Sequence, residues 1–421
     1  MRALAGIGLL SAVALLFQVS LTRVFSVAQF YHFAFLVVSL ALLGFGASGT
    51  LLAIWPGLRG RGWRPLFTLA LGPAVVLAYT VLNVWPFDSY TIAWDRTQVW
   101  RLLGNLLVLA VPFTLAGAVL GSALGDPAYA AGRVYGVNLI GSALGAGAAP
   151  LLLAWLGDVR SILACAVLAG GAAILLADGA RRPRLIAALG SVVIAAGAAG
   201  ALAPPDFLTV RPSPYKTLSH FQRTPDATLA GPRYNATSRL DLVRSPTIHS
   251  APGLSMTYLG ELPPQVGLLI DGDNLIAVPQ GEAVTPAFAQ ALPAALAFAQ
   301  TSAPDVLILG GGMDAAIALA LGARSVTVVE PNSLIADVLQ GELRDWAGLA
   351  DPRVTLIHAE LRAYARQAGR RFDVVQLALN DTYRPVTSGA FTLTEDYRHT
   401  VEGFADYLDL LTPDGVLIVT R

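Results

Sequence analysis

The chain has 421 residues, enough for two or three domains, and 55% of them are hydrophobic while only 13% are charged. Residues 1–205 hold 12 Arg, 5 Asp and neither Lys nor Glu, a net charge of +7, whereas residues 206–421 hold 16 basic and 23 acidic residues, a net charge of −7. This division predicts two parts that lie in different solvents. A single cysteine, Cys165, excludes an intrachain disulfide and a cysteine-ligated metal cluster.

Residues 1–205 contain nearly charge-free segments of the kind that cross a lipid bilayer. Most of them reach the roughly 20 residues needed to span about 30 Å of hydrocarbon. Charged residues collect in short connections, as the cost of burying an ionised side chain in lipid requires. We therefore expect a multi-pass protein of a cell (inner) membrane, with the lipid bilayer as partner and about seven helices. The segments are 4–22, 30–55, 66–85, 102–124, 134–156, 162–177 and 185–203.

Small residues are frequent in the later segments. The sequence Gly121-Ser-Ala-Leu-Gly125 recurs as Gly141-Ser-Ala-Leu-Gly145. Two glycines four positions apart let helix backbones approach closely in lipid, so we expect close helix packing here. A substrate path between these helices is the alternative interpretation.

Residues 206–285 differ in composition and predict a small β-rich region. Turn sequences such as Pro263-Pro264 and Asp271-Gly272-Asp273 separate short alternating runs at 238–243 and 266–270, which predict strands. We expect a lid or hairpin region here, followed by a short helix at 286–299.

Residues 286–421 alternate between apolar strands and amphipathic helices. This pattern predicts a parallel sheet with helices on both faces, an α/β doubly wound (Rossmann-like) domain. The chain stops directly after the fifth strand, so we expect the last strands of this fold to be missing. Strands are expected at 306–309, 325–329, 354–357, 372–378 and 415–419, and helices at 314–321, 334–346, 361–368 and 395–411.

A glycine triplet follows the first of these strands. Gly310, Gly311 and Gly312 have no side chains, so the chain can turn sharply and a ligand can lie against the backbone. Glu330 ends the second strand, at the spacing of an acid that accepts hydrogen bonds from a ribose diol. Together they predict an adenosine-type ligand at the carboxyl ends of the strands. The alternative is a retained fold whose pocket no longer binds.

Residues 305–421 resemble the class I methyltransferase fold, and specifically its spermidine synthase-like (polyamine aminopropyltransferase) branch. Similar multi-pass segments are fused to such domains in many bacterial proteins. The sequences that carry the resemblance are Val306–Gly312 before Asp314, Phe372-Asp-Val-Val with Asn380-Asp381, Leu411-Thr-Pro-Asp-Gly-Val-Leu417, and, upstream, Ser213-Pro-Tyr-Lys216 and Leu269-Ile-Asp-Gly-Asp273.

The resemblance implies S-adenosylmethionine or decarboxylated S-adenosylmethionine as cofactor and a polyamine or other amine as substrate. Glu330 would hold the ribose and Glu360 would lie near the adenine. Asp381 would be the catalytic acid that handles the amine, although a turn or helix-cap aspartate remains an alternative. Tyr258 and Asp273 would lie on the substrate side. The implied cofactor-binding residues are Gly310, Gly311, Gly312, Asp314, Glu330, Glu360 and Asn380.

Two departures from the family pattern bear on activity. Ala378 stands where the family has the acid that deprotonates the amine, and Met313 stands where it has an acid directly after the glycines. Methyl transfer tolerates these losses better than aminopropyl transfer, because much of its catalysis is positioning. We therefore expect a membrane-anchored aminopropyl- or methyltransferase; the alternative is a catalytically degenerate subunit that uses the fold as an interaction module in a larger membrane complex or a homo-oligomer.

The sequence is consistent with either side of the membrane for the C-terminal domain. With seven crossings, one face of the helical part carries eight Arg and the other four, and the positive-inside rule places the richer face, with the amino terminus, in the cytoplasm. The C-terminal domain would then lie outside, where no S-adenosyl cofactor is made. Either one segment does not span, or the domain is external. No metal-ligand spacing and no basic aromatic face occurs, so we expect neither a metal nor a nucleic-acid partner.

Overall fold

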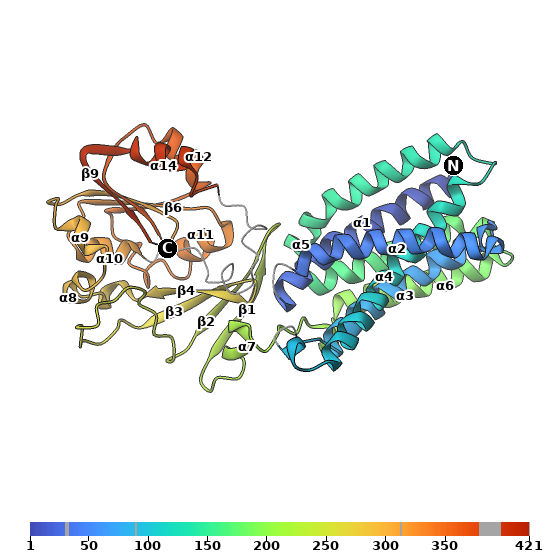
Figure 1. Ribbon diagram of the computed structural model, residues 1–421, viewed down its shortest axis with the longest axis horizontal. Helices are drawn as coiled ribbons and strands as arrows, with labels where there is room; N and C mark the ends of the chain where they lie inside the picture. Colours follow the sequence, from blue (N-terminus) through green and yellow to red (C-terminus); the bar gives the residue numbers. More distant parts are fainter. Residues whose placement is uncertain (30–32, 89–90, 312–313, 379–396, 421) are drawn as a thin grey trace. The chain divides into compact units, whose positions relative to one another are not determined.

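The computed structural model describes residues 1–29, 33–88, 91–311, 314–378 and 397–420. The chain divides into two compact units. Unit 1 comprises Met1–Pro214 with Tyr234–Ser238, and unit 2 comprises Tyr215–Arg233 with Arg239–Arg421. Figure 1 shows that unit 1 is a bundle of helices, whereas unit 2 combines strands with short helices.

Unit 1 is built from long apolar helices. In its described residues, 6 helices are long and apolar enough to cross a membrane. Their apolar side chains form one continuous core that includes Leu10, Phe17, Tyr79 and Phe113. The helices are α1 (Arg2–Ala28), α2 (Ala34–Ile54), α3 (Trp63–Val84), α4 (Thr97–Leu124), α5 (Ala131–Leu176) and α6 (Pro183–Leu202).

Helix α5 is bent back on itself at Gly157. This residue has φ 76° and ψ −175°, a conformation open essentially only to glycine. Val137 on the first arm lies against Gly8, and Leu176 on the second arm lies against Gly6, so both ends of α5 reach the same end of α1. A straight helix would separate residues 137 and 176 by roughly 58 Å, at 1.5 Å per residue. The two arms correspond to the fifth and sixth segments expected from the sequence.

The first arm of α5 packs closely against α1. A Cβ atom added at Gly141 would lie 2.0 Å from the Gly8 carbonyl oxygen, and one added at Gly145 would lie 2.1 Å from the Ala12 carbonyl oxygen. No side chain fits at either position, so the two backbones touch directly. Close packing at the second copy of the glycine repeat is therefore confirmed.

Unit 2 begins with a four-stranded sheet of order β1-β2-β3-β4, in which β2, β3 and β4 pair antiparallel. Asp271 (φ 53°) and Gly272 (φ 71°) connect β3 and β4 in the left-handed conformation that tight hairpins use. The two expected strands are confirmed as β2 and β3. The strands are β1 (Thr228–Tyr234), β2 (Arg239–Arg244), β3 (Gln265–Ile270) and β4 (Asp273–Pro279), and helix α7 (Thr217–Phe221) precedes them.

The single helix expected at 286–299 is wrong. Two short helices, α8 (Pro286–Gln290) and α9 (Ala295–Phe298), occupy this stretch. Pro293 lies between them. It has no backbone N–H to donate within a helix, and its ring would clash with a carbonyl of the preceding helical turn. Thr285 begins α8 by accepting a hydrogen bond from the Phe288 backbone N–H.

The second sheet of unit 2 has five parallel strands in the order β7-β6-β5-β8-β9. Val306 and Val374 pack on one face of it, and Leu307 and Val375 on the other, so both faces are buried. The expected α/β fold is confirmed (Figure 1). Its elements are β5 (Asp305–Leu309), α10 (Asp314–Ala320), β6 (Ser325–Glu330), α11 (Ser333–Gln340), β7 (Val354–His358), α12 (Leu361–Gln367), β8 (Phe372–Leu377), α14 (Val401–Leu408) and β9 (Leu411–Val419).

Two helices are shorter than expected. Helix α11 ends at Gln340, because Gly341 follows with a non-helical backbone (φ −100°, ψ −106°). Helix α14 begins at Val401, where the Thr400 side chain caps the first turn. Residues 395 and 396, the expected start of this helix, lie outside the described residues.

Candidate functional site

The strand order of the five-stranded sheet defines where a ligand would bind. The chain runs from β5 outward through β6 to β7, and then returns to the other side of β5 as β8 and β9. In such sheets, ligands occupy the crevice at the carboxyl ends of the strands on either side of this reversal. Gly310 directly follows β5, and Ala378 directly follows β8.

The turn after β5 requires glycine. Gly310 has φ 79° and Gly311 has φ 66°, both in the left-handed region where a side chain is strained. The Gly310 N–H donates to the Val329 carbonyl at 2.8 Å, and the Asp314 N–H donates to the Gly311 carbonyl at 3.0 Å. The backbone therefore turns sharply at the end of the central strand with no side chain above it. Gly312 and Met313 lie outside the described residues.

Glu330 ends the neighbouring strand β6 and is only 3% exposed. Its Oε1 atom accepts a hydrogen bond of 2.8 Å from the Asn332 N–H. Burial raises the pKa of this carboxyl to about 7, against smaller lowering effects of that hydrogen bond and of the Arg398 charge. A buried carboxyl one strand from the glycine turn provides the acceptor that ribose hydroxyls need.

Asp314 begins helix α10 and faces strand β8. Its Oδ2 atom accepts a hydrogen bond of 3.0 Å from Nε2 of Gln376. Because side chains alternate along a strand, Gln376 and Ala378 point to the same face of β8. Burial raises the pKa of the Asp314 carboxyl to about 7. The Asp314 carboxyl therefore lies over the face of β8 to which Gln376 and Ala378 both belong.

Asp314 and Gln376 line a cavity of about 470 Å³. Its wall is mostly apolar and comes from both sheets of unit 2 and from α8 and α10. Among the lining residues that the structure describes, Asp314 is the only one that is charged. Apolar residues of the wall include Leu275, Ile276, Phe288, Leu292, Ile317 and Ile418. The cavity can hold a largely apolar group with one polar end at Asp314.

Three of the other expected site residues are described by the structure and do not line this cavity. Glu360 is exposed and caps helix α12 by accepting a backbone hydrogen bond. Asp273 accepts a hydrogen bond of 2.6 Å from the Thr217 hydroxyl, which ties helix α7 to β4. Tyr258 forms a T-shaped ring contact with Phe288, which lines the cavity, but does not line it itself. The expected residues Asn380 and Asp381 lie outside the described residues.

Sequence reasoning missed Gln376 as a site residue. It lies in β8 among apolar residues and is buried. A lone amide in an otherwise apolar buried strand signals a polar partner, because an unpaired buried amide is costly. Here that partner is Asp314.

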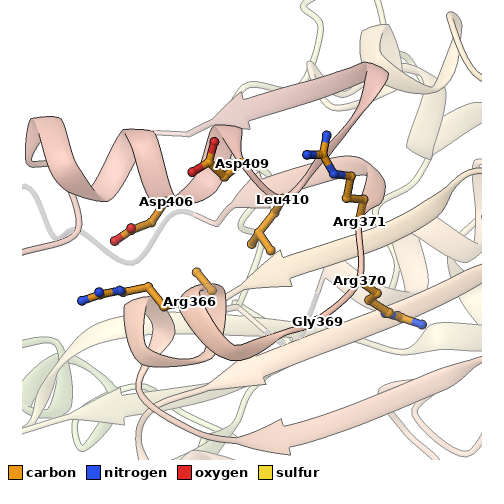
Figure 2. Close-up of a pocket in the computed structure, with 8 residues that line it drawn as sticks. Arg366, Gly369, Arg370, Arg371, Asp406, Asp409 and Leu410 are labelled. Atoms are coloured by element: carbon orange, nitrogen blue, oxygen red, sulfur yellow. The ribbon is translucent and has the colours of Figure 1, made fainter.

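A second cavity, of about 430 Å³, lies at the opposite edge of the sheet. Its lining residues Gly369, Arg370 and Arg371 directly precede β8, which places it at the amino ends of the strands. Figure 2 shows that the side chains of Arg366, Arg370 and Arg371 point in different directions rather than toward one centre. The candidate site is therefore the one at the carboxyl edge.

Comparisons with known proteins identify no family. No protein-family model and no curated protein matches the chain. Among solved structures, the spermidine synthase from Thermotoga maritima aligns with a TM-score of 0.32 and 19% identity over 45% of this chain and 56% of that chain. A spermidine synthase in complex with the transition state analogue AdoDATO aligns with a TM-score of 0.31 and 19% identity over 45% of this chain and 55% of that chain. The aligned region thus spans little more than half the length of either enzyme.

Proposed function

We propose that unit 2 is the transferase domain of a membrane-anchored protein and binds S-adenosylmethionine or its decarboxylated form. The observation that carries this proposal is the pair of left-handed glycines at the strand-order reversal, with the buried carboxyl of Glu330 at the end of the next strand. Gly310 and Gly311 would lie under the amino-acid part of the ligand. Glu330 would accept hydrogen bonds from its ribose.

The proposed reaction is methyl or aminopropyl transfer to an amine. When bound, such a nucleoside supplies an electrophilic carbon that the amine nitrogen attacks, while the carbon–sulfur bond breaks and leaves a neutral thioether. The attacking nitrogen must be unprotonated, so a nearby group has to accept its proton. Asp314 has a pKa raised to about 7 by burial, which suits a proton acceptor at neutral pH. We propose that it serves as the base that position 378 lacks.

The cavity beside Asp314 indicates the class of amine. A substrate with two cationic ends would need a second acid, and the described wall carries none beyond Asp314. Ile276, Phe288 and Ile317 instead offer apolar contact. We propose a substrate with one amino group and a largely apolar body.

Calorimetric titration of the purified full chain tests the proposal. S-adenosylmethionine, decarboxylated S-adenosylmethionine and methylthioadenosine are titrated into the wild type, the Glu330→Gln variant and a control, Glu402→Gln, which changes an exposed acid on α14. Losing a charged acceptor to the ribose should weaken binding about tenfold or more in Glu330→Gln, while the control binds like the wild type. If no nucleoside binds at millimolar concentration, the transferase proposal is wrong and the non-catalytic interaction module is favoured.

A further inference from the structure

A cavity in unit 1 gathers three arginines at one end of the helix bundle. It measures about 340 Å³ and lies where α2 gives way to α3 and where α4 ends. Its charged lining residues are Arg59, Arg61, Arg64 and Asp126. Gly60, Gly121 and Gly125 line it as well, so backbone groups form part of the wall.

The acid in this cavity is fully engaged by two of the arginines. Arg61 donates to both carboxylate oxygens of Asp126, at 2.6 and 2.7 Å, and Arg64 donates to Oδ2 at 2.8 Å. Asp126 lies outside the membrane-crossing helices, and its hydrogen bonds with Arg61 hold the pKa of its carboxyl well below the usual range. The acid therefore stays ionised. Among the lining residues that the structure describes, three arginines against one aspartate give a net charge of +2.

The arginines are held in place by the protein. Arg64 is 5% exposed, and it donates to the Ser122 hydroxyl at 3.0 Å and to the Ser122 carbonyl at 2.7 Å. Arg59 donates from Nε to the Leu52 carbonyl at 3.0 Å, which ties this side chain to the end of α2. A buried ion pair needs one arginine for one acid, so neutralising Asp126 does not explain Arg59. Fixed arginine nitrogens around a cavity are the usual donors for phosphate oxygens.

Flanking aromatic residues place the cavity at headgroup depth, on the premise that unit 1 lies in a bilayer. Trp55 directly follows α2 and Trp63 begins α3, and both are exposed. Tryptophans are enriched at the boundary between lipid tails and headgroups. Basic pockets between helices at this depth bind the headgroups of anionic lipids. The cavity is also far larger than a phosphate ion alone requires.

We propose that this cavity binds the phosphate of an anionic phospholipid, with Arg59 and Arg61 as the contacting residues and Arg64 as the residue that positions Asp126 and Arg61. The site is independent of the proposed transferase activity, since it belongs to unit 1. A lipid held there would join the loop before α3 to the end of α4.

Lipid binding to the full chain in neutral detergent tests the proposal. Native mass spectrometry counts bound phosphatidylglycerol, with phosphatidylcholine as the zwitterionic control and inorganic phosphate as the free anion. The variants are Arg59→Gln, which leaves the Asp126 pairs intact, and Arg182→Gln, an exposed arginine at the start of α6 that does not line the cavity. One basic side chain near an anionic headgroup contributes about fivefold in affinity.

The proposal expects Arg59→Gln to lose about fivefold in phosphatidylglycerol affinity relative to Arg182→Gln, with little binding of phosphatidylcholine to any variant. Equal affinities in the two variants would overturn it, because the attraction would then be a general property of the arginine-rich face. Inorganic phosphate that displaces the lipid at equal concentration would also overturn it, and would make the cavity a site for the free anion.

Discussion

Two buried carboxyl groups, Glu330 and Asp314, determine the chemistry of the candidate site. Both have pKa values raised to about 7, and in each case burial is the main cause. A carboxyl in this state can accept a proton from a substrate near neutral pH, which an exposed carboxylate does poorly. In the proposed site the two acids have separate tasks: Glu330 would accept the ribose hydroxyls, and Asp314 lines the apolar cavity.

The raised pKa of Asp314 predicts how stability depends on pH. Its folded value, about 7, exceeds the value near 3.9 of an unfolded chain, so the folded protein holds a proton that the unfolded chain releases. This contribution to the free energy of unfolding is complete below about pH 4 and is lost as the pH rises to about 7, by on the order of 2–4 kcal/mol. Asp314→Asn should flatten the dependence.

Denaturant midpoints between pH 5 and 8 measure this effect. The exposed acid Asp409 provides the control variant, Asp409→Asn, which should keep the wild-type slope. Parallel slopes in the wild type and Asp314→Asn would mean that Asp314 is not a buried, protonated acid. Methyl or aminopropyl transfer, if measured, should rise through the same pH range and be lost in Asp314→Asn.

Comparing Gly310→Ala with Gly322→Ala separates the effect of backbone strain on stability from the effect of an added side chain on ligand binding. An alanine at φ 79° costs about 1–2 kcal/mol of stability. Gly322 also has a left-handed φ, of 92°, but an added Cβ there meets no atom within 4 Å. Both variants should therefore be destabilised by their left-handed backbone, while only Gly310→Ala should lose nucleoside binding by calorimetry. Equal binding by the two variants would contradict the position proposed for the ligand.

The sequence predicts some of these residues better than others. Gly310 and Glu330 are predictable because strand, turn, strand and terminal acid follow one another along the chain. The hydrogen bond between Asp314 and Gln376 is not, because it joins a helix to a strand 62 residues away. Glu360 fits the expected spacing, yet it caps α12, a local role that a family pattern does not distinguish from ligand binding.

At the scale of elements, the bend in α5 shows why segment lengths alone mislead. Ala131 to Leu176 form two helical arms that meet at the non-helical Gly157, and together they are too long for one bilayer crossing. Asp158 and Arg160 reveal the break in the sequence, because charged residues seldom lie at mid-bilayer. That the turn falls on Gly157 could not be predicted, since glycines are frequent throughout this unit.

Cysteine labelling tests whether α5 crosses the membrane twice. Cys165 is fully buried, so it should react little with a maleimide reagent. Arg96→Cys lies before α4, Arg160→Cys follows the α5 bend, and Arg181→Cys lies before α6. With two crossings, positions 96 and 160 should react from one side of the membrane and position 181 from the other. A cysteine at 160 that is protected from both sides would contradict the double crossing.

At the scale of the whole molecule, the opposite net charges of the two halves correspond to two compact units of different architecture. The apolar, arginine-bearing half forms the helix bundle, and the acidic half forms the two sheets. The fold class of each half was therefore predictable from composition and periodicity. The β-rich region was predictable only in part, because its order of strands depends on contacts between distant residues.

The side of the membrane on which unit 2 lies decides between the two functional hypotheses. S-adenosyl nucleosides are made in the cytoplasm, so the transferase proposal expects an exposed position in unit 2, Ser302→Cys, to be protected in intact cells and reactive in inverted vesicles. The arginine bias of the helical part alone predicts the reverse. Labelling of position 302 in intact cells would therefore contradict the transferase and favour an external interaction module.

The direct backbone contact between α1 and the first arm of α5 also bears on how the protein is assembled. The ribosome releases α1 first, and three further helices must be made before Gly141 can meet Gly8. Until then the narrow strip of α1 around Gly8 and Ala12 lacks its partner on α5. The bundle therefore cannot be completed until α5 has been synthesised. A chain stalled before α5 would leave this strip of α1 exposed to the helices of other proteins or to quality-control proteases.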